Sequence, residues 1–234
     1  MIQTLKYGDS GLVARIFTRK LGMQTYLVRG VRKAKSSRKQ YLFQPLTIVS
    51  MVVSHKEKAS LHYIKEIQLL DPYQAIPYEI KKTSLAIFLA EILSHALKNQ
   101  EANEALFLFL RTSLLQLDNT GNPVSNLHLV LLLKLSKYLG FQPRNNYDSR
   151  HRFFNLQEGL FQSVKGNSPD FMDQEESLAF ANISDSSLEA QDKLHFSNDL
   201  RKRLLQHTIN YYRHHVAGMP EIKSHKVLEV IFAD

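Results

Sequence analysis

Apolar and polar residues alternate with a period of two through the first seventy positions of the chain. Because successive side chains of a strand point to opposite faces, this alternation predicts half-buried strands. A turn rich in glycine separates the first two segments at Gly8–Gly11. The predicted strands cover Ile2–Tyr7, Leu12–Thr18, Gln24–Val31, Phe43–Val53 and Lys58–Leu70. Five short strands in so short a stretch are typical of a small closed barrel, which leaves no sheet edge exposed.

The pattern changes at Asp71–Pro72, beyond which apolar residues recur with helical spacing. The third helical segment is apolar on nearly every side, so we expect it at the centre of a helical bundle. Gly140 and Pro143 follow that segment, and both residue types end helices. The predicted helices cover Tyr78–Lys98, Glu104–Leu117, Val124–Leu139 and Asn198–Val216, with a shorter one between Ser168 and Ala181.

Residues 144–170 interrupt the helical pattern with asparagine, glycine and proline. Two short extended pieces in this stretch, Phe153–Leu156 and Leu160–Ser163, are candidates for pairing. The sequence therefore predicts an α+β protein, with a five-stranded barrel in residues 1–72 and an α-helical bundle domain in residues 73–234. A small irregular insertion that contains β-structure is expected within the second domain, at about residues 144–167.

Charge is distributed unevenly between these two predicted domains. The chain has 234 residues and a net charge of +8. Residues 1–70 hold thirteen Lys/Arg against three Asp/Glu, a net of +10, so the remaining 17 basic and 19 acidic residues give −2. We infer two modules with different roles, of which the N-terminal one faces a polyanion.

Six basic residues fall within eleven positions between the third and fourth predicted strands, and no acid interrupts them: Arg29, Arg32, Lys33, Lys35, Arg38 and Lys39. Lysine and arginine neutralise phosphates and release counterions, so this basic run predicts binding to a nucleic acid. We expect Arg15, Arg19 and Lys20 to extend the basic track, provided that their strand and turn share its face. A solvated loop without a partner is the alternative interpretation.

Aromatic residues lie close to the basic run in sequence. Tyr26 and Tyr41 flank it, Phe43 follows, and Tyr63 falls in the fifth predicted strand. On the outside of a barrel such rings stack on unpaired bases, which contributes ~1–3 kcal/mol per base. Part of this set is equally compatible with the protein core. We predict Tyr26 and Tyr41 as members of the nucleic-acid-binding set.

The search for catalytic chemistry identifies no candidate. The chain has no cysteine, which excludes disulfides, thiolate zinc sites and cysteine nucleophiles. Neither a dinucleotide-binding nor a P-loop glycine motif is present. A hairpin turn explains Gly8–Gly11 better than a serine nucleophile does, and His207 and His214 fit a solvated helix face better than a metal site. We therefore predict no catalytic residue, no metal and no cofactor.

No apolar run is long enough for a membrane span, and Lys6 and Asp9 interrupt the N-terminus too early for a signal peptide. These features predict a cytoplasmic protein without a membrane partner.

Several segments, taken in order, resemble the RecO family of bacterial recombination mediators. The segments that carry the resemblance are Tyr7–Val13, Phe17–Gly22, Tyr26–Lys33, Leu42–Leu46, Glu66–Pro72, Leu89–Leu93 and Leu139–Pro143. The likeness is strongest in residues 4–50 and weak beyond residue 165. None of the segments is diagnostic alone, but their order and spacing are fairly specific.

The resemblance implies an OB-fold followed by a helical domain. It also implies binding to single- and double-stranded DNA, annealing of complementary strands, and an association with the bacterial nucleoid. The implied partners are RecR, the acidic C-terminal tail of single-stranded-DNA-binding protein and, indirectly, RecA. None of these activities is enzymatic. An RNA-binding OB-fold module is the alternative, since phosphate contacts and stacking do not separate RNA from single-stranded DNA. A metal-free hydrolase is a second alternative, which would require a cleft with perturbed titratable groups.

Two departures from the family pattern stand out. Many members carry a four-cysteine zinc site after the central helix, whereas Arg144–Ser163 has no cysteine and His151 alone cannot restore the site. We expect aromatic packing to replace the metal. Relatives also usually carry several residues before the equivalent of Ile2, so we expect either a trimmed first strand or a Met1 that is an internal start.

The last long predicted helix offers a candidate partner site. An acidic peptide with an apolar tip needs a pocket beside positive charge. Arg201, Lys202, Arg203 and Arg213 lie near Leu204 and Tyr212 on this helix. An ordinary amphipathic helix end accounts for the same residues equally well.

Overall fold

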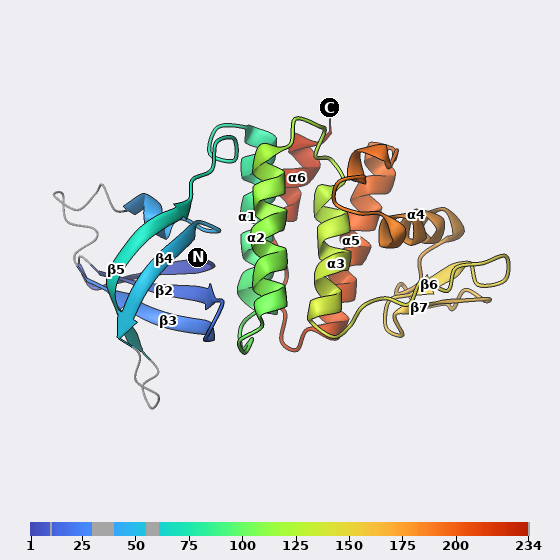
Figure 1. The fold of residues 1–234 in the computed structure, drawn as a ribbon. Coiled ribbons are helices and arrows are strands. Elements are labelled where there is room, and N and C mark those ends of the chain that lie inside the picture. The colour runs from blue at the N-terminus through green and yellow to red at the C-terminus, as the bar shows by residue number, and fades with distance from the viewer. Residues whose placement is uncertain (10, 30–39, 55–60, 234) are drawn as a thin grey trace. The chain divides into compact units, whose positions relative to one another are not determined.

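The computed structural model describes residues 1–9, 11–29, 40–54 and 61–233. They form two compact units (Figure 1). The first unit contains residues Met1–Glu79 and Ala86–Asp118, and the second contains Ile80–Leu85 and Asn119–Asp234. Helix α1, Ile80–Ala96, contributes to both units. Each unit is described by itself.

A five-stranded sheet forms the N-terminal part of the first unit. Its strands are β1 (Gln3–Tyr7), β2 (Gly11–Thr18), β3 (Gly22–Val28), β4 (Ile48–Ser54) and β5 (His62–Asp71). They are ordered β1-β2-β3-β5-β4, and all neighbours are antiparallel except the β3–β5 pair. The α+β class and the five-stranded sheet are thus confirmed. The described residues show no ladder between β1 and β4, so the sheet is not closed there as a full barrel.

The fourth strand begins later than the sequence pattern predicted. Residues 40–43 form a turn of 3₁₀ helix, and Leu46 adopts a φ of 62° immediately after Pro45. Proline has no N–H to donate to a ladder, so pairing starts only at Ile48. Strand β3 ends before Arg29 and β5 begins after Leu61, and the rest of the predicted extensions, to Val31 and back to residue 58, lies outside the described residues.

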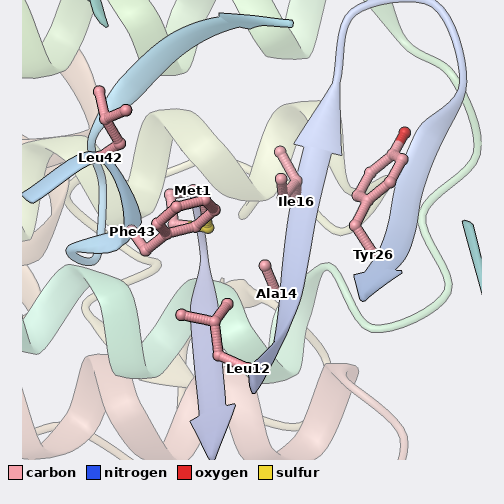
Figure 2. Close-up of a cluster of buried hydrophobic side chains, with 7 residues drawn as sticks. All are labelled: Met1, Leu12, Ala14, Ile16, Tyr26, Leu42 and Phe43. Atoms are coloured by element: carbon pink, nitrogen blue, oxygen red, sulfur yellow. The ribbon is translucent and has the colours of Figure 1, made fainter. Parts of the chain in front are cut away.

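The apolar side chains at alternate positions of β2 form the core of the sheet. Leu12, Ala14 and Ile16 point to one face, and Tyr26 of β3 joins them (Figure 2). Leu42 and Phe43 of the 3₁₀ turn complete the cluster together with Met1. The period-two pattern therefore identified the buried face correctly, although the turn was mistaken for strand.

Helix α2 (Glu104–Asn119) fixes the segment that follows β5. The Asp118 carboxylate, which is buried, accepts backbone N–H bonds from Gln74, Ala75 and Ile76 at 2.7–2.8 Å. Arg111 forms a bidentate ion pair with Asp71, at 2.7 and 2.9 Å. The hydrogen bond from Arg111 lowers the pKa of Asp71. Two charged side chains of one helix thus hold the end of the sheet.

The turn between α1 and α2 contacts the start of β3. Met23 donates its backbone N–H to the carbonyl of Gln100 at 2.8 Å. Gly22 has a φ of 67°, and a Cβ at this position would come within 2.5 Å of the Gln100 carbonyl oxygen. Only glycine meets both conditions without a shift of the backbone.

Helix α3 lies at the centre of the second unit. Its elements are α3 (Leu127–Tyr138), β6 (Phe153–Asn155), β7 (Leu160–Gln162), α4 (Gln174–Asp185), η2 (Gln191–Lys193), α5 (Asn198–His215) and α6 (His225–Ile231). Nine of the twelve residues of α3 are buried, and the helix contacts both α4 and α5. The predicted central helix is therefore confirmed.

Helix α4 begins later than its predicted start. Asp173 is its N-cap, and its carboxylate accepts the N–H of Glu176 while the Glu176 side chain accepts the N–H of Asp173. This reciprocal capping box fixes the first turn at Gln174. Helix α6 was not predicted, because two turns provide too few positions for a periodic signal.

Aromatic rings pack the β6–β7 insertion. Phe154 contacts Phe161 at 4.9 Å, Phe180 at 4.4 Å and Tyr211 at 5.9 Å between ring centroids. The side-chain amide of Asn146 exchanges two 2.9 Å hydrogen bonds with the backbone of Phe161. The insertion is therefore held by apolar packing and backbone hydrogen bonds.

None of the helices in the described part of the chain has both the length and the apolar character to cross a membrane.

Replacing Asp118 tests the anchor at the end of β5. Asp118→Ala leaves three backbone N–H groups without their acceptor, so we expect the free energy of unfolding of the first unit to fall by about 3 kcal/mol. Asp118→Asn keeps one acceptor oxygen and is expected to lose less. Urea denaturation followed by circular dichroism measures both. The exposed Asp9→Ala is the matched control, and equal stability of the Asp118→Ala and Asp9→Ala variants would contradict the anchoring role.

Candidate nucleic-acid interface

Arg29 is the residue of the basic run that the structure describes. It is exposed at the end of β3, and its guanidinium carbon lies 5.5 Å from the centroid of the Tyr63 ring. This is a cation–π distance. The other members of the run lie outside the described residues: Arg32, Lys33, Lys35, Arg38 and Lys39.

A surface hollow of about 490 Å³ lies beside Arg29. Tyr63 and Lys65 of β5 line it together with Leu27 and Phe43. Tyr63 is 45% exposed, whereas Phe43 is 4% exposed. The hollow thus combines apolar side chains with an accessible ring, two cations and the carboxylate of Glu66, a net charge of +1 that suits a phosphate-linked base.

A β-bulge sets the orientation of the side chains on β5. The β4–β5 register passes from Val52↔Glu66 to Val53↔Ile64, so Lys65 is the extra residue. Ile64 and Ile67 pack against the core while Tyr63 and Lys65 are exposed. A bulge of this kind re-aims side chains. Direct pairing of Leu27 with Tyr63 places this face of β5 beside the end of β3.

Two of the predicted stacking residues differ in their environment. Tyr41 is 54% exposed and keeps the accessibility that stacking needs. Tyr26 is fully buried in the sheet core, so its assignment as a nucleic-acid-binding residue is corrected (Figure 2). Its hydroxyl finds no hydrogen-bond partner within the described residues, and desolvation raises its pKa.

Of the three residues predicted to extend the basic track, Arg15, Arg19 and Lys20, two are bonded to other parts of the chain. Arg19 forms an ion pair with Glu104. Arg15 donates to the backbone carbonyls of Ser94 at 3.4 Å and Lys98 at 3.2 Å. Both guanidinium groups therefore attach the sheet to the ends of helices and are not free phosphate contacts. Lys20 remains exposed.

Lys65 was missed by the sequence analysis, and Tyr63 was noted but not selected. A single lysine in a strand carries no signal of its own. Tyr63 and Lys65 are two positions apart on β5, so they share a face by the period of a strand. The bulge lets Ile64 and Ile67, which are three positions apart, both pack against the core, and it leaves no mark in an alternating pattern.

The candidate partner residues on α5 lie in different environments. Arg203 contacts three carboxylates of this chain, those of Glu175, Glu176 and Asp199, and its role in binding an acidic peptide stays a prediction. Arg201 donates to Asn126, Asn198 and the carbonyl of Phe196 at 2.6–3.1 Å. Lys202 and Arg213 are exposed.

The insertion does not fit a zinc ion. It has no cysteine, and His151 is paired with Asp148 at 3.0 Å. Hydrogen bonds from the backbone and then the side chain of His151 lower the pKa of Asp148 to about 2. Across the described residues, no group of three metal-ligating side chains is assembled.

Comparison with known proteins gives a consistent relationship over the whole chain. A family model described as "Recombination protein O N terminal" matches residues 1–73, and "Recombination protein O C terminal" matches residues 77–225. The "DNA repair protein RecO" of Flavobacterium psychrophilum is 36% identical over 234 residues, which cover 100% of this chain and 97% of that protein. The protein of the same name from Phocaeicola vulgatus is 33% identical over 233 residues, with 100% and 97% covered.

A matched pair of tyrosine substitutions tests the environment of Tyr26. Tyr26→Phe removes a buried hydroxyl without a described partner, so we expect the melting temperature to stay the same or rise. Tyr212→Phe removes a buried hydroxyl that donates to the Leu132 carbonyl at 2.7 Å, and should cost about 1 kcal/mol. Thermal denaturation measures both, with nucleic-acid affinity as a second readout. A loss of affinity in folded Tyr26→Phe would contradict its burial in the core.

Proposed function

This chain belongs to the RecO family of DNA repair proteins, and on that premise we propose that it is a recombination mediator. In this proposal it binds single- and double-stranded DNA, anneals complementary strands and catalyses no covalent reaction. It acts in the cytoplasm, on the nucleoid. The observation that carries the proposal is the grouping of Arg29, Tyr63 and Lys65 around one hollow at the start of the basic run.

Two kinds of interaction support DNA as the ligand. Arg29 and Lys65 contact phosphates and release counterions, which gives affinity without reading the sequence. Tyr63 and Tyr41 stack on unpaired bases, which favours a single strand over a duplex. The basic residues from Arg32 to Lys39 add charge directly after Arg29 in the sequence.

Annealing follows from charge neutralisation. Two DNA strands repel each other through their phosphates, and a protein that neutralises one strand lowers this barrier for the second. The stacking residues hold bases apart from one another and leave their pairing edges accessible. No general acid, base or nucleophile is required for this process.

The partner interactions are assigned to the second unit. Lys202 and Arg201 line a shallow hollow of about 10 Å³ with Leu205, Leu228, Phe232 and the acidic Glu229. We propose that the surface around Lys202 receives the acidic, apolar-tipped C-terminal tail of single-stranded-DNA-binding protein. Arg213 lies about three turns further along the same face of α5 and extends the positive charge. Contact with RecR, and through it help in loading RecA, completes the proposed role.

RNA is the alternative ligand for the same surface. Phosphate contacts and stacking act on both polymers, and recognition of the 2′-hydroxyl is what would separate them. Competition between labelled single-stranded DNA and unlabelled RNA of the same sequence decides between the two.

Neutralising the basic run tests the electrostatic part of the proposal. In the variant Arg32→Ala, Lys33→Ala, Lys35→Ala and Arg38→Ala, we expect weaker binding to single-stranded DNA and a shallower salt dependence. Each lost phosphate contact removes about 0.7 from the slope of log K against log salt concentration. Fluorescence anisotropy at several salt concentrations measures the slope. The control removes four exposed charges elsewhere: Lys98→Ala, Lys137→Ala, Lys193→Ala and Lys226→Ala. An unchanged slope in the first variant would remove the basic run from the interface.

Substitution of Tyr63 tests the stacking part. Tyr63→Leu keeps an apolar side chain but loses the ring, so we expect affinity for single-stranded DNA to fall by ~1–3 kcal/mol while affinity for duplex changes little. Titrations with the two forms of DNA measure the difference. Tyr78→Leu is the matched control, because Tyr78 is 83% exposed and does not line the hollow. Equal losses for single strand and duplex would show that Tyr63 does not stack on bases.

A further inference from the structure

Annealing requires two strands to be held together, and the hollow beside Arg29 accounts for one. Beyond residue 70 the chain has 17 Lys/Arg and 19 Asp/Glu, so a second basic surface there must come from local grouping. Residues 144–165 hold four Lys/Arg and two Asp/Glu, whereas residues 166–192 hold seven Asp/Glu and no Lys/Arg. The β6–β7 insertion is thus a locally basic stretch of the second unit, as are residues 193–213, which hold five Lys/Arg and one Asp/Glu.

Strand pairing brings these residues together. The backbone of Arg144 forms a parallel bridge with Leu160 on one side of β7, and β6 pairs with the other side. Arg152 immediately precedes β6 and donates its N–H to the carbonyl of Gln162 at 3.0 Å. The basic residues of the insertion therefore come from three adjacent segments of a small sheet.

A hollow of about 690 Å³ lies on this sheet. Arg144, His151 and Ser163 line it, and the Arg144 guanidinium and the Ser163 hydroxyl offer hydrogen-bond donors to an anion. Arg150 and Arg152 flank His151 in the sequence, and both are exposed. Positive charge with a hydroxyl donor around an open hollow suits a phosphodiester group.

Asp148 is the one acid among the described residues that line the hollow. Its carboxylate accepts the backbone N–H groups of Arg150 and His151 at 2.7 Å and contacts the His151 ring nitrogen Nδ1 at 3.0 Å. The Asp148 carboxylate is thus hydrogen-bonded to these local groups, and none of the donors is an arginine guanidinium. The arginine side chains remain available to a ligand.

The scaffold under these cations is fixed. Asn146 is bonded twice to the backbone of Phe161, and Phe161 packs edge-on against Tyr147 at 5.3 Å and Phe154 at 4.9 Å. Charges on a rigid surface lose less conformational entropy when they bind an extended polyanion. Arg203 of α5 differs, because it is neutralised by carboxylates of the same chain.

We propose that the hollow on the β6–β7 insertion binds the sugar–phosphate backbone of the second DNA strand during annealing. The proposal rests on the proposed function and adds to it that the two complementary strands occupy different units of one molecule. Binding of the first strand to the N-terminal unit does not depend on the insertion, whereas strand annealing depends on it.

A separation-of-function variant tests this division. Arg144→Ala, Arg150→Ala and Arg152→Ala remove three exposed cations and leave Asn146, Asp148 and the aromatic packing in place. We expect the affinity for one single-stranded oligonucleotide to change less than about threefold, while the annealing rate of two complementary labelled oligonucleotides falls about tenfold or more. The matched control removes three exposed lysines from the same unit: Lys137→Ala, Lys193→Ala and Lys226→Ala. It should anneal at the wild-type rate, and circular dichroism confirms the fold of each variant.

Any other outcome of this experiment contradicts either the proposed function or the second-strand site, and the outcomes distinguish the two. If the wild-type protein binds DNA but does not anneal it, the proposed function falls. If the wild type anneals and the triple-arginine variant anneals equally fast, the second-strand site falls and the proposed function stands. The site also falls if single-strand affinity and annealing decline by the same factor, or if the control loses as much as the triple-arginine variant. An annealing rate that rises with the square of protein concentration would place the second strand on a second copy of the chain.

Discussion

The attachment of the sheet to α2 is the constraint on which the first unit depends. Asp118 gathers three backbone N–H groups just after β5, and Arg111 holds Asp71 at the end of the same strand. Three hydrogen bonds offset the cost of burying the Asp118 carboxylate, whereas burying the same group without partners would be strongly unfavourable. Because the last turns of one helix fix both points, the end of β5 has a defined position. The exposed side chains at its other end, Tyr63 and Lys65, are then displayed on an ordered strand.

The contacts between the sheet and the helices also determine which basic side chains are available to bind phosphate. Arg15 bonds to carbonyls near the end of α1, and Arg19 pairs with Glu104 at the start of α2. Neither can serve the fold and a phosphate at the same time without giving up its present partner. Among the described residues, positive charge at the sheet is therefore divided between Arg15 and Arg19, which contact helices, and Arg29 and Lys65, which are exposed. The net charge of the N-terminal region overstates its capacity for DNA for this reason.

The sequence was sufficient to predict the elements but not the partners of their charged residues. Alternation located the buried face of β2, and continuous apolar character located α3, because both signals repeat over many positions. The bulge at Lys65, the late start of β4 after Pro45 and the ion pairs of Arg19 and Arg203 depend on single residues meeting distant ones. Tyr26 shows the limit most clearly: its position beside the basic run suggested exposure, while the strand period placed its ring inside. The identity of the stacking residues could not follow from nearness in sequence.

In the β6–β7 insertion of the second unit, packed aromatic rings support a surface that carries several charged side chains. In the insertion, the Phe161 ring contacts both Phe154 and Tyr147, and the Asn146 amide is the polar link. A metal site would bring its own positive charge and would fix the local electrostatics. An aromatic core is neutral, so the charge of residues 144–165 is set by their four Lys/Arg and two Asp/Glu. The packed rings therefore give these charged side chains a rigid platform.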